Sequence, residues 1–145
     1  MRNQIKIYLI LIYLTFFSIS SFASEKIKIG LVVPLSGDSK ELGESVLNSV
    51  KLAINDINDN RLVIIPKDNR NNSDRTLEVS KDLYNEGIKI IIGPIFKKNT
   101  IKLNQLNNDL IFLSFTNKIN KTNKNIINAG VNSVSQFKAI KKFQT

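Results

Sequence analysis

The chain has 145 residues, a formal net charge of +9, and no cysteine, histidine or tryptophan. The missing cysteine excludes disulfides, thiolate metal sites and a lipid-bearing cysteine. The missing histidine excludes Ser-His and Cys-His nucleophilic catalysis, so a zinc site would need carboxylates alone. The length suits one modest domain, and the positive charge is spread without a single basic block, which disfavours a nucleic-acid partner.

Residues 1–23 have the pattern of a cleavable signal peptide. Residues 1–6 carry two positive charges, residues 7–22 are mostly apolar, and Ser21 and Ala23 place small side chains where a signal peptidase cleaves. A transmembrane anchor is the alternative, because the apolar run is close to the lower length limit for spanning a bilayer. The polar sequence SEKIK that follows favours cleavage after Ala23, so we expect an exported protein of the periplasm.

The mature chain begins with a strand pattern followed by a helix pattern. Residues 26–33 alternate at first and then become continuously apolar, which predicts a strand buried on both faces. Residues 41–58 carry apolar side chains at steps of three and four, which predicts an amphipathic helix. Either Asp38 or Ser39 is expected to cap the exposed amides of this helix.

A second strand and a second helix are expected next. Residues 62–65 predict the strand, and Pro66 ends it. After a polar loop, Ser73 or Asp74 is expected to cap a helix that runs to about residue 86, where a glycine follows.

The rest of the chain continues the alternation of strands and helices. The expected elements are a third strand at 88–92, a weaker helix at about 98–107, a fourth strand at 110–115, a short edge strand at 126–129, and a helix that begins at 133 and extends to 143. Strands and helices that alternate with short connections indicate right-handed crossovers. We therefore predict an α/β fold, a doubly wound parallel sheet with helices on both faces.

Three expected strands end in turns that suit a ligand site, because open parallel sheets bind ligands at the carboxyl ends of their strands. Gly37 and Gly93 permit close backbone approach, and the hydroxyls of Ser36, Ser114 and Thr116 are placed to orient a ligand. The alternative is that these are ordinary turn residues of any such sheet. The candidate ligand-binding residues are Ser36, Gly37, Gly93, Pro94, Ile95, Phe96, Ser114, Phe115 and Thr116.

Other site chemistries lack their signatures. The sequence has no G-x-G-x-x-G after the first strand and no G-x-x-x-x-G-K-[ST], which disfavours dinucleotide and nucleoside triphosphate sites. No pair of carboxylates is placed together at the strand ends, as general acid-base catalysis requires. We therefore expect no enzyme, metal or cofactor, and we interpret the acidic residues as solvated surface charges: Asp56, Asp59, Asp68, Asp74, Glu78 and Asp82.

The sequence resembles a known family of exported proteins. IKIGLVVPLSG, the helix bearing NSVKLAINDIN, IKIIIGPIF and LIFLSFTN are similar to the first lobe of type I periplasmic binding proteins of the leucine/isoleucine/valine-binding group. The resemblance extends from about residue 26 to 143, and its most specific parts are the P-L-S-G and I-I-G-P turns. It implies a protein that binds an amino acid or small anion and delivers it to the membrane permease of an ABC transporter.

The resemblance also implies a domain organisation. Residues 24–130 match the first lobe, and residues 131–145 match the start of a second lobe, so we expect a fragment or a truncated gene product. In amino-acid binders of this family, hydroxyl residues help to hold the ligand at two positions. The first corresponds to Lys97 in this sequence, and the second falls near Lys118, with Thr116 close by. Two lysines suit an anionic ligand; the alternative is a cleft that has lost its ligand.

Two other functions remain open at this point. IIPKDN, GPIF and SFTN are also similar to the activators of penicillin-binding proteins, which use this fold to contact a peptidoglycan synthase instead of a solute. An enzyme on the same sheet ranks third, because no catalytic constellation is present.

Overall fold

The computed structural model describes residue 4 and residues 25–106, 109–117, 123–130 and 133–143. The signal peptide expected at residues 1–23 lies outside the described residues, except for Gln4. Within the described ranges, no helix combines the length and the apolar character needed to cross a membrane.

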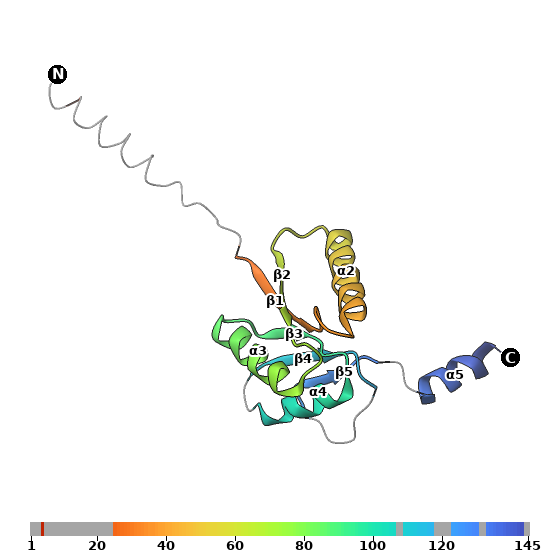
Figure 1. Cartoon of the computed structure of the whole chain (residues 1–145). Helices are drawn as coiled ribbons and strands as arrows, with labels where there is room; N and C mark the ends of the chain where they lie inside the picture. Colours follow the sequence, from red (N-terminus) through yellow and green to blue (C-terminus); the bar gives the residue numbers. More distant parts are fainter. Residues whose placement is uncertain (1–3, 5–24, 107–108, 118–122, 131–132, 144–145) are drawn as a thin grey trace.

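Five parallel strands form one sheet in the order β2-β1-β3-β4-β5 (Figure 1). The strands are β1 (Ile27–Val33), β2 (Leu62–Asp68), β3 (Ile90–Ile92), β4 (Ile111–Ser114) and β5 (Ile126–Asn128). The apolar runs of the sequence form the central strands, and β2 and β5 are the edges. The structure thus confirms the predicted α/β class and the parallel sheet.

The helices lie on both faces of this sheet. They are α2 (Lys40–Ile57), α3 (Ser73–Asn85), α4 (Lys97–Lys102) and the 3-10 turn η1 (Leu103–Gln105). A further helix, α5 (Ser133–Phe143), follows β5 in the chain and does not cover the sheet. The chain steps in one direction from β1 to β2 and then in the other, past β1, to β3 and β4. Right-handed crossovers therefore place α2 on one face and both α3 and α4 on the other, as Figure 1 shows.

The hydrophobic core lies between the sheet and the α3–α4 layer. Val32, Ile91 and Phe112 are fully buried on this face of three neighbouring strands. Val79 and Leu83 of α3 pack against the same cluster, four residues apart on one side of the helix. Alternation along each strand thus sends one set of side chains into this core.

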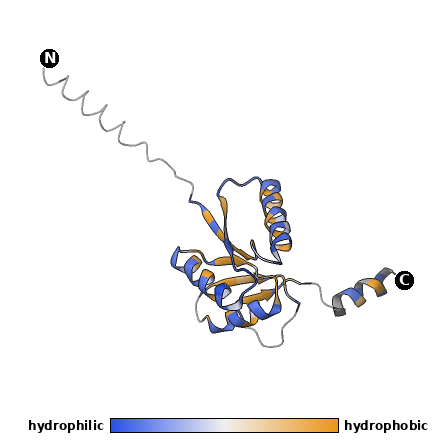
Figure 2. Ribbon diagram, in the orientation of Figure 1, coloured by the Kyte–Doolittle hydropathy of each residue, from blue (hydrophilic) through white to orange (hydrophobic). Residues whose placement is uncertain are grey.

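The opposite face of the sheet is only partly covered. There α2 packs against β1 and β2. Ile90, Ile111 and Ile127 on the remaining strands are 42%, 45% and 53% exposed. Figure 2 shows apolar residues along the strands, while the helices combine apolar and polar faces.

The second strand is longer than predicted. It continues through Pro66 to Asp68, and Pro66 lies in register with Leu31 of β1. Proline is tolerated here because β2 is an edge strand, so the missing N–H leaves the pairing with β1 intact. The extension carries Asp68 to the carboxyl end of the sheet, where the prediction had placed only a loop charge.

The helix caps also differ from the predictions. The side chain of Asn72, one residue before the expected positions, accepts a hydrogen bond from the Arg75 amide and caps α3. Ser39 is the N-cap residue of α2 but forms no side-chain capping bond, and its hydroxyl instead accepts from the Asn71 amide group. The third helix is shorter than expected, because α4 passes into η1 after six residues.

We predict that Gly43→Ala destabilises the protein by about 1–3 kcal/mol. Alanine in a helix interior is ordinarily better than glycine by about 1 kcal/mol, but a Cβ at Gly43 would clash with the Pro34 carbonyl oxygen. That oxygen belongs to the backbone and cannot rotate away. The clash therefore outweighs the better helix propensity of alanine, and the variant is less stable. Urea unfolding measures the change, and Ser45→Ala at an exposed position of α2 is the control. A stability equal to wild type would contradict this prediction.

Candidate functional site

The structure brings the ends of β3 and β4 into direct contact. The Gly93 amide donates to the Leu113 carbonyl at 2.8 Å, and the Phe115 amide donates to the Pro94 carbonyl at 3.1 Å. Gly93 has φ +105°, and a Cβ there would collide with the carbonyl of Val32 in β1. The glycine thus permits close approach to a neighbouring strand.

A buried hydroxyl cluster lies beneath these two strand ends. Ser114 Oγ is 2.8 Å from Thr100 Oγ1 and 3.0 Å from Thr116 Oγ1, and it donates to the Pro94 carbonyl at 3.0 Å. Thr116 Oγ1 donates to Asn128 Oδ1 at 3.0 Å. The hydroxyls of Ser114 and Thr116, expected to orient a ligand, therefore connect β4 to α4, β5 and the turn after β3.

The turn after β1 is held in place by a carboxylate. Asp68, at the end of β2, accepts hydrogen bonds from the Leu35 amide at 2.8 Å and from the Ser36 hydroxyl at 2.5 Å. The Arg70 amide donates to the same carboxylate at 2.8 Å. Asp68 is therefore a structural group that fixes the turn after β1, which corrects its interpretation as a solvated charge.

The electrostatics of Asp68 follow from these contacts. Partial burial acts to raise the pKa of Asp68, but hydrogen bonds from Ser36, Leu35 and Arg70, aided by the Arg70 charge, outweigh it, so the pKa lies below its usual value. The carboxylate remains ionised at neutral pH and acts as an anchor for the turn.

A pocket of about 360 Å³ opens at the ends of β3 and β4. Its lining residues are Ile95, Phe96, Lys97, Phe115, Thr116 and Asn117. Two segments of three consecutive residues thus form the walls, one running from the turn after β3 into the first residue of α4 and the other directly after β4. The volume is within the range of about 300–1,000 Å³ that is usual for small-molecule sites.

Some of the predicted site residues line this pocket and others do not. Ile95, Phe96, Phe115 and Thr116 are part of the lining. Gly93, Pro94 and Ser114 lie behind it in backbone contacts and the hydroxyl cluster. Ser36 and Gly37 belong to the separate turn at the end of β1, where Ser36 is held by Asp68.

Two lining residues were not among the predicted ligand-binding residues. Asn117 follows Thr116 directly in the S-F-T-N turn, and its amide is exposed. Lys97 follows the G-P-I-F turn, and the sequence indicated it only as a departure from the family pattern. Lys118, the second such departure, lies outside the described residues.

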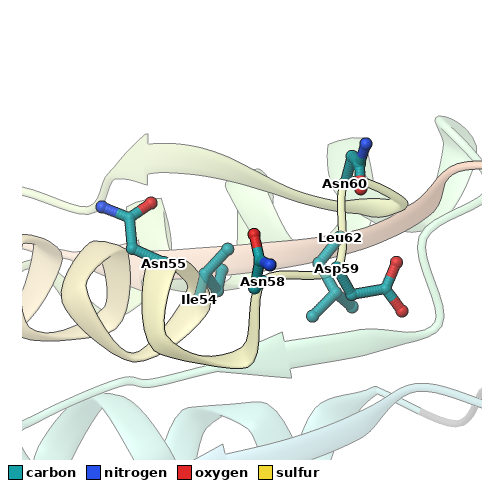
Figure 3. A pocket seen from close by; sticks show the side chains of 6 residues that line it. All are labelled: Ile54, Asn55, Asn58, Asp59, Asn60 and Leu62. Atoms are coloured by element: carbon teal, nitrogen blue, oxygen red, sulfur yellow. The ribbon is translucent and has the colours of Figure 1, made fainter.

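A larger hollow of about 470 Å³ lies at the other end of the sheet, between the end of α2 and the start of β2 (Figure 3). Its lining consists of Ile54, Asn55, Asn58, Asp59, Asn60 and Leu62. The side-chain hydrogen bond from Arg61 is the main cause that lowers the pKa of Asp59 to about 2. Because its one carboxylate is already paired and it lies at the amino ends of the strands, this hollow is the weaker candidate.

The described residues contain no group of three acidic, histidine or cysteine side chains that would hold a metal ion. The chemistry of the pocket at β3 and β4 is therefore that of one cation, one amide and several apolar or aromatic side chains.

We predict that Asp68→Asn lowers the free energy of unfolding by about 1–3 kcal/mol at pH 6, because hydrogen bonds to a charged acceptor are lost. The folded-state pKa of Asp68 is lowered. Its stabilisation is therefore fully present above the unfolded value of about 3.9 and is lost as the pH falls through the folded value.

Urea unfolding between pH 3 and 6 should show the gap between wild type and variant narrowing below about pH 4. Asp56→Asn, at an exposed position of α2, is the control and should cause no comparable loss. A gap that stays constant with pH would contradict the assigned role of the Asp68 charge.

Two solved structures of ABC transporter proteins have a fold similar to that of this chain. A solute-binding protein of an ABC transporter from Rhodopseudomonas palustris, solved with 3,4-dihydroxybenzoic acid, is 23% identical, with a TM-score of 0.58 over 62% of this chain and 27% of that chain. An ABC-type branched-chain amino acid transporter protein from Rhodopseudomonas palustris is 19% identical, with a TM-score of 0.64 over 74% of this chain and 33% of that chain.

A third similar structure is the C-domain of LpoA from Haemophilus influenzae, a regulator of PBP1A. It is 19% identical, with a TM-score of 0.66 over 81% of this chain and 38% of that chain. This chain thus spans less than two fifths of each of these structures. No curated protein matches the sequence. The sequence model of the family described as "Periplasmic binding protein" matches residues 26–141. The chain therefore belongs to the periplasmic binding protein family.

Proposed function

We propose that this chain is the first lobe of an extracytoplasmic solute-binding protein, which captures a small solute and delivers it to the permease of an ABC-type uptake system. The observation that carries the proposal is the pocket between residues 95–97 and 115–117. It lies at the carboxyl ends of two adjacent parallel strands, where sheets of this type bind ligands. The signal-peptide pattern of residues 1–23 supports a location outside the cytoplasm.

The similar structures support this proposal without fixing the solute. One was solved with an aromatic acid, and another is described as a branched-chain amino acid transporter protein. The resemblance of the sequence implies amino-acid uptake, and the side chains that line the pocket narrow the class of solute further. Binding without catalysis fits the lining, which within the described residues offers no carboxylate or histidine for proton transfer.

We predict that the purified secreted chain gains thermal stability with a solute from a panel of amino acids, aromatic acids and sugars. A ligand at a hundredfold excess over its Kd stabilises the folded state by about 2.7 kcal/mol. Asn117→Ala removes an exposed amide from the pocket and should reduce this gain. Asn48→Ala, at an exposed position of α2, is the control and should preserve it. A panel without any stabilising solute would overturn the proposal.

A second function is favoured by a specific observation. The likeness to the LpoA C-domain covers 81% of this chain, against 62% and 74% for the two transporter structures. LpoA is described as a regulator of PBP1A. The second candidate is therefore an activator of a penicillin-binding protein, which would act through surface contacts and without a solute.

This candidate predicts direct binding to a purified penicillin-binding protein that synthesises peptidoglycan, and a faster rate of peptidoglycan polymerisation. The measurement is the polymerisation rate with and without the secreted chain. Asn117→Ala should leave the rate unchanged, since a solute pocket plays no part in this mechanism. If neither binding nor acceleration occurs, the activator function is excluded.

A further inference from the structure

We propose that the pocket between residues 95–97 and 115–117 binds an aromatic monocarboxylate that lacks an α-ammonium group, with Lys97 as its counter-charge. The inference rests on the proposed solute-binding function and specifies the class of solute. It is carried by three properties of the pocket: its one free cation, its lack of an anionic partner, and its aromatic walls.

The charge of Lys97 is not engaged within the described part of the chain. Some described lysines form ion pairs, as Lys67 does with Glu86 at 2.7 Å and Lys102 does with Asp74 at 2.7 Å. No such pair includes Lys97, although it is exposed and lines the pocket. An unpaired cation at the mouth of a pocket favours an anionic group on the ligand.

The pocket lining contains no carboxylate to pair with an ammonium ion. It has no acidic residue. The carboxylate at the neighbouring strand end, Asp68, already accepts from Leu35, Ser36 and Arg70. The hydroxyl of Thr116 is likewise committed to buried partners. An α-amino acid would therefore bring a cation beside Lys97 without a compensating charge from this lining, which discriminates against it.

The walls of the pocket suit an aromatic ring. Phe96 and Phe115 are half-buried, one on each of the two lining segments, and Ile95 adds an aliphatic surface. Aromatic pairs prefer offset or edge-to-face contact, which a planar ring in this pocket can make. Phosphate and sulfate carry more charge than one lysine neutralises and have no apolar part for these walls. The lining thus selects a single negative charge on an aromatic body.

The test is titration of the ¹⁵N-labelled secreted chain with sodium benzoate, isoleucine and inorganic phosphate, each to millimolar concentration, with amide shifts followed by NMR. We expect benzoate alone to shift the amides of residues 95–97 and 115–117. Lys97→Gln should weaken benzoate binding by about fivefold, the effect of one exposed ion pair. Lys98→Gln makes the same charge change on a residue outside the lining and should leave the affinity unchanged.

Other outcomes distinguish a failure of the aromatic-acid inference from a failure of the solute-binding function. If isoleucine shifts the same amides as strongly as benzoate, the solute-binding function stands and the aromatic-acid inference is wrong. If benzoate binds equally well to wild type and Lys97→Gln, the assigned counter-charge is wrong. If none of the three probes shifts these amides, and the wider panel also fails to stabilise the chain, the solute-binding function itself is overturned.

Discussion

The hydroxyl of Ser114 is the contact on which the geometry of the carboxyl edge depends. A hydroxyl has one donor and two acceptor sites, and this one donates to the Pro94 carbonyl at 3.0 Å and accepts from Thr100 Oγ1 at 2.8 Å and from the Thr116 backbone amide at 3.3 Å. The Ser114 side chain is fully buried, so its hydrogen-bond partners must come from the protein. Loss of one partner would leave a buried polar atom unsatisfied. Two segments, residues 94–100 and 114–116, thus share one anchor. The pocket walls, residues 95–97 and 115–117, are attached to it on both sides.

This anchor determines which side chains remain for a ligand. Alternation continues past the end of β4, so that Ser114 and Thr116 are buried while Phe115 and Asn117 are more exposed. The inward pair supplies the hydroxyl cluster, and the outward pair lines the pocket together with Thr116. Thr116 therefore belongs to both the cluster and the pocket wall, whereas Ser114 belongs to the cluster alone. Where the alternation of side chains directs a strand-end hydroxyl inward, that hydroxyl forms hydrogen bonds within the protein.

The fold class was predictable because apolar runs and amphipathic stripes are local signals, and the order of elements then limits the topology. The role of Asp68 was not predictable from local rules, since Pro66 suggests a strand end and only the edge position of β2 removes that restriction. The predicted site residues lie in the turns at the carboxyl edge of the sheet, and four of the nine line the pocket there; that they bind a ligand stays a prediction. The alternation of β4 also contained the signal that Thr116 points inward, whereas the free charge of Lys97 emerges only from the ion pairs of its neighbours.

In a pocket as open as this one, the affinity for a ligand and the selectivity between ligand classes depend on different features. Sites for small ligands usually bury about 70–90% of the ligand surface, and six residues on two segments contact a ligand from one side. A micromolar complex has a binding free energy of about −8.2 kcal/mol, and one wall supplies only part of those contacts. Charge and aromatic contacts act at short range, however, so they distinguish ligand classes even when binding is weak. Under the proposed solute-binding function, the residues of this wall set the chemical class of the solute, and the degree of enclosure sets how tightly it is held.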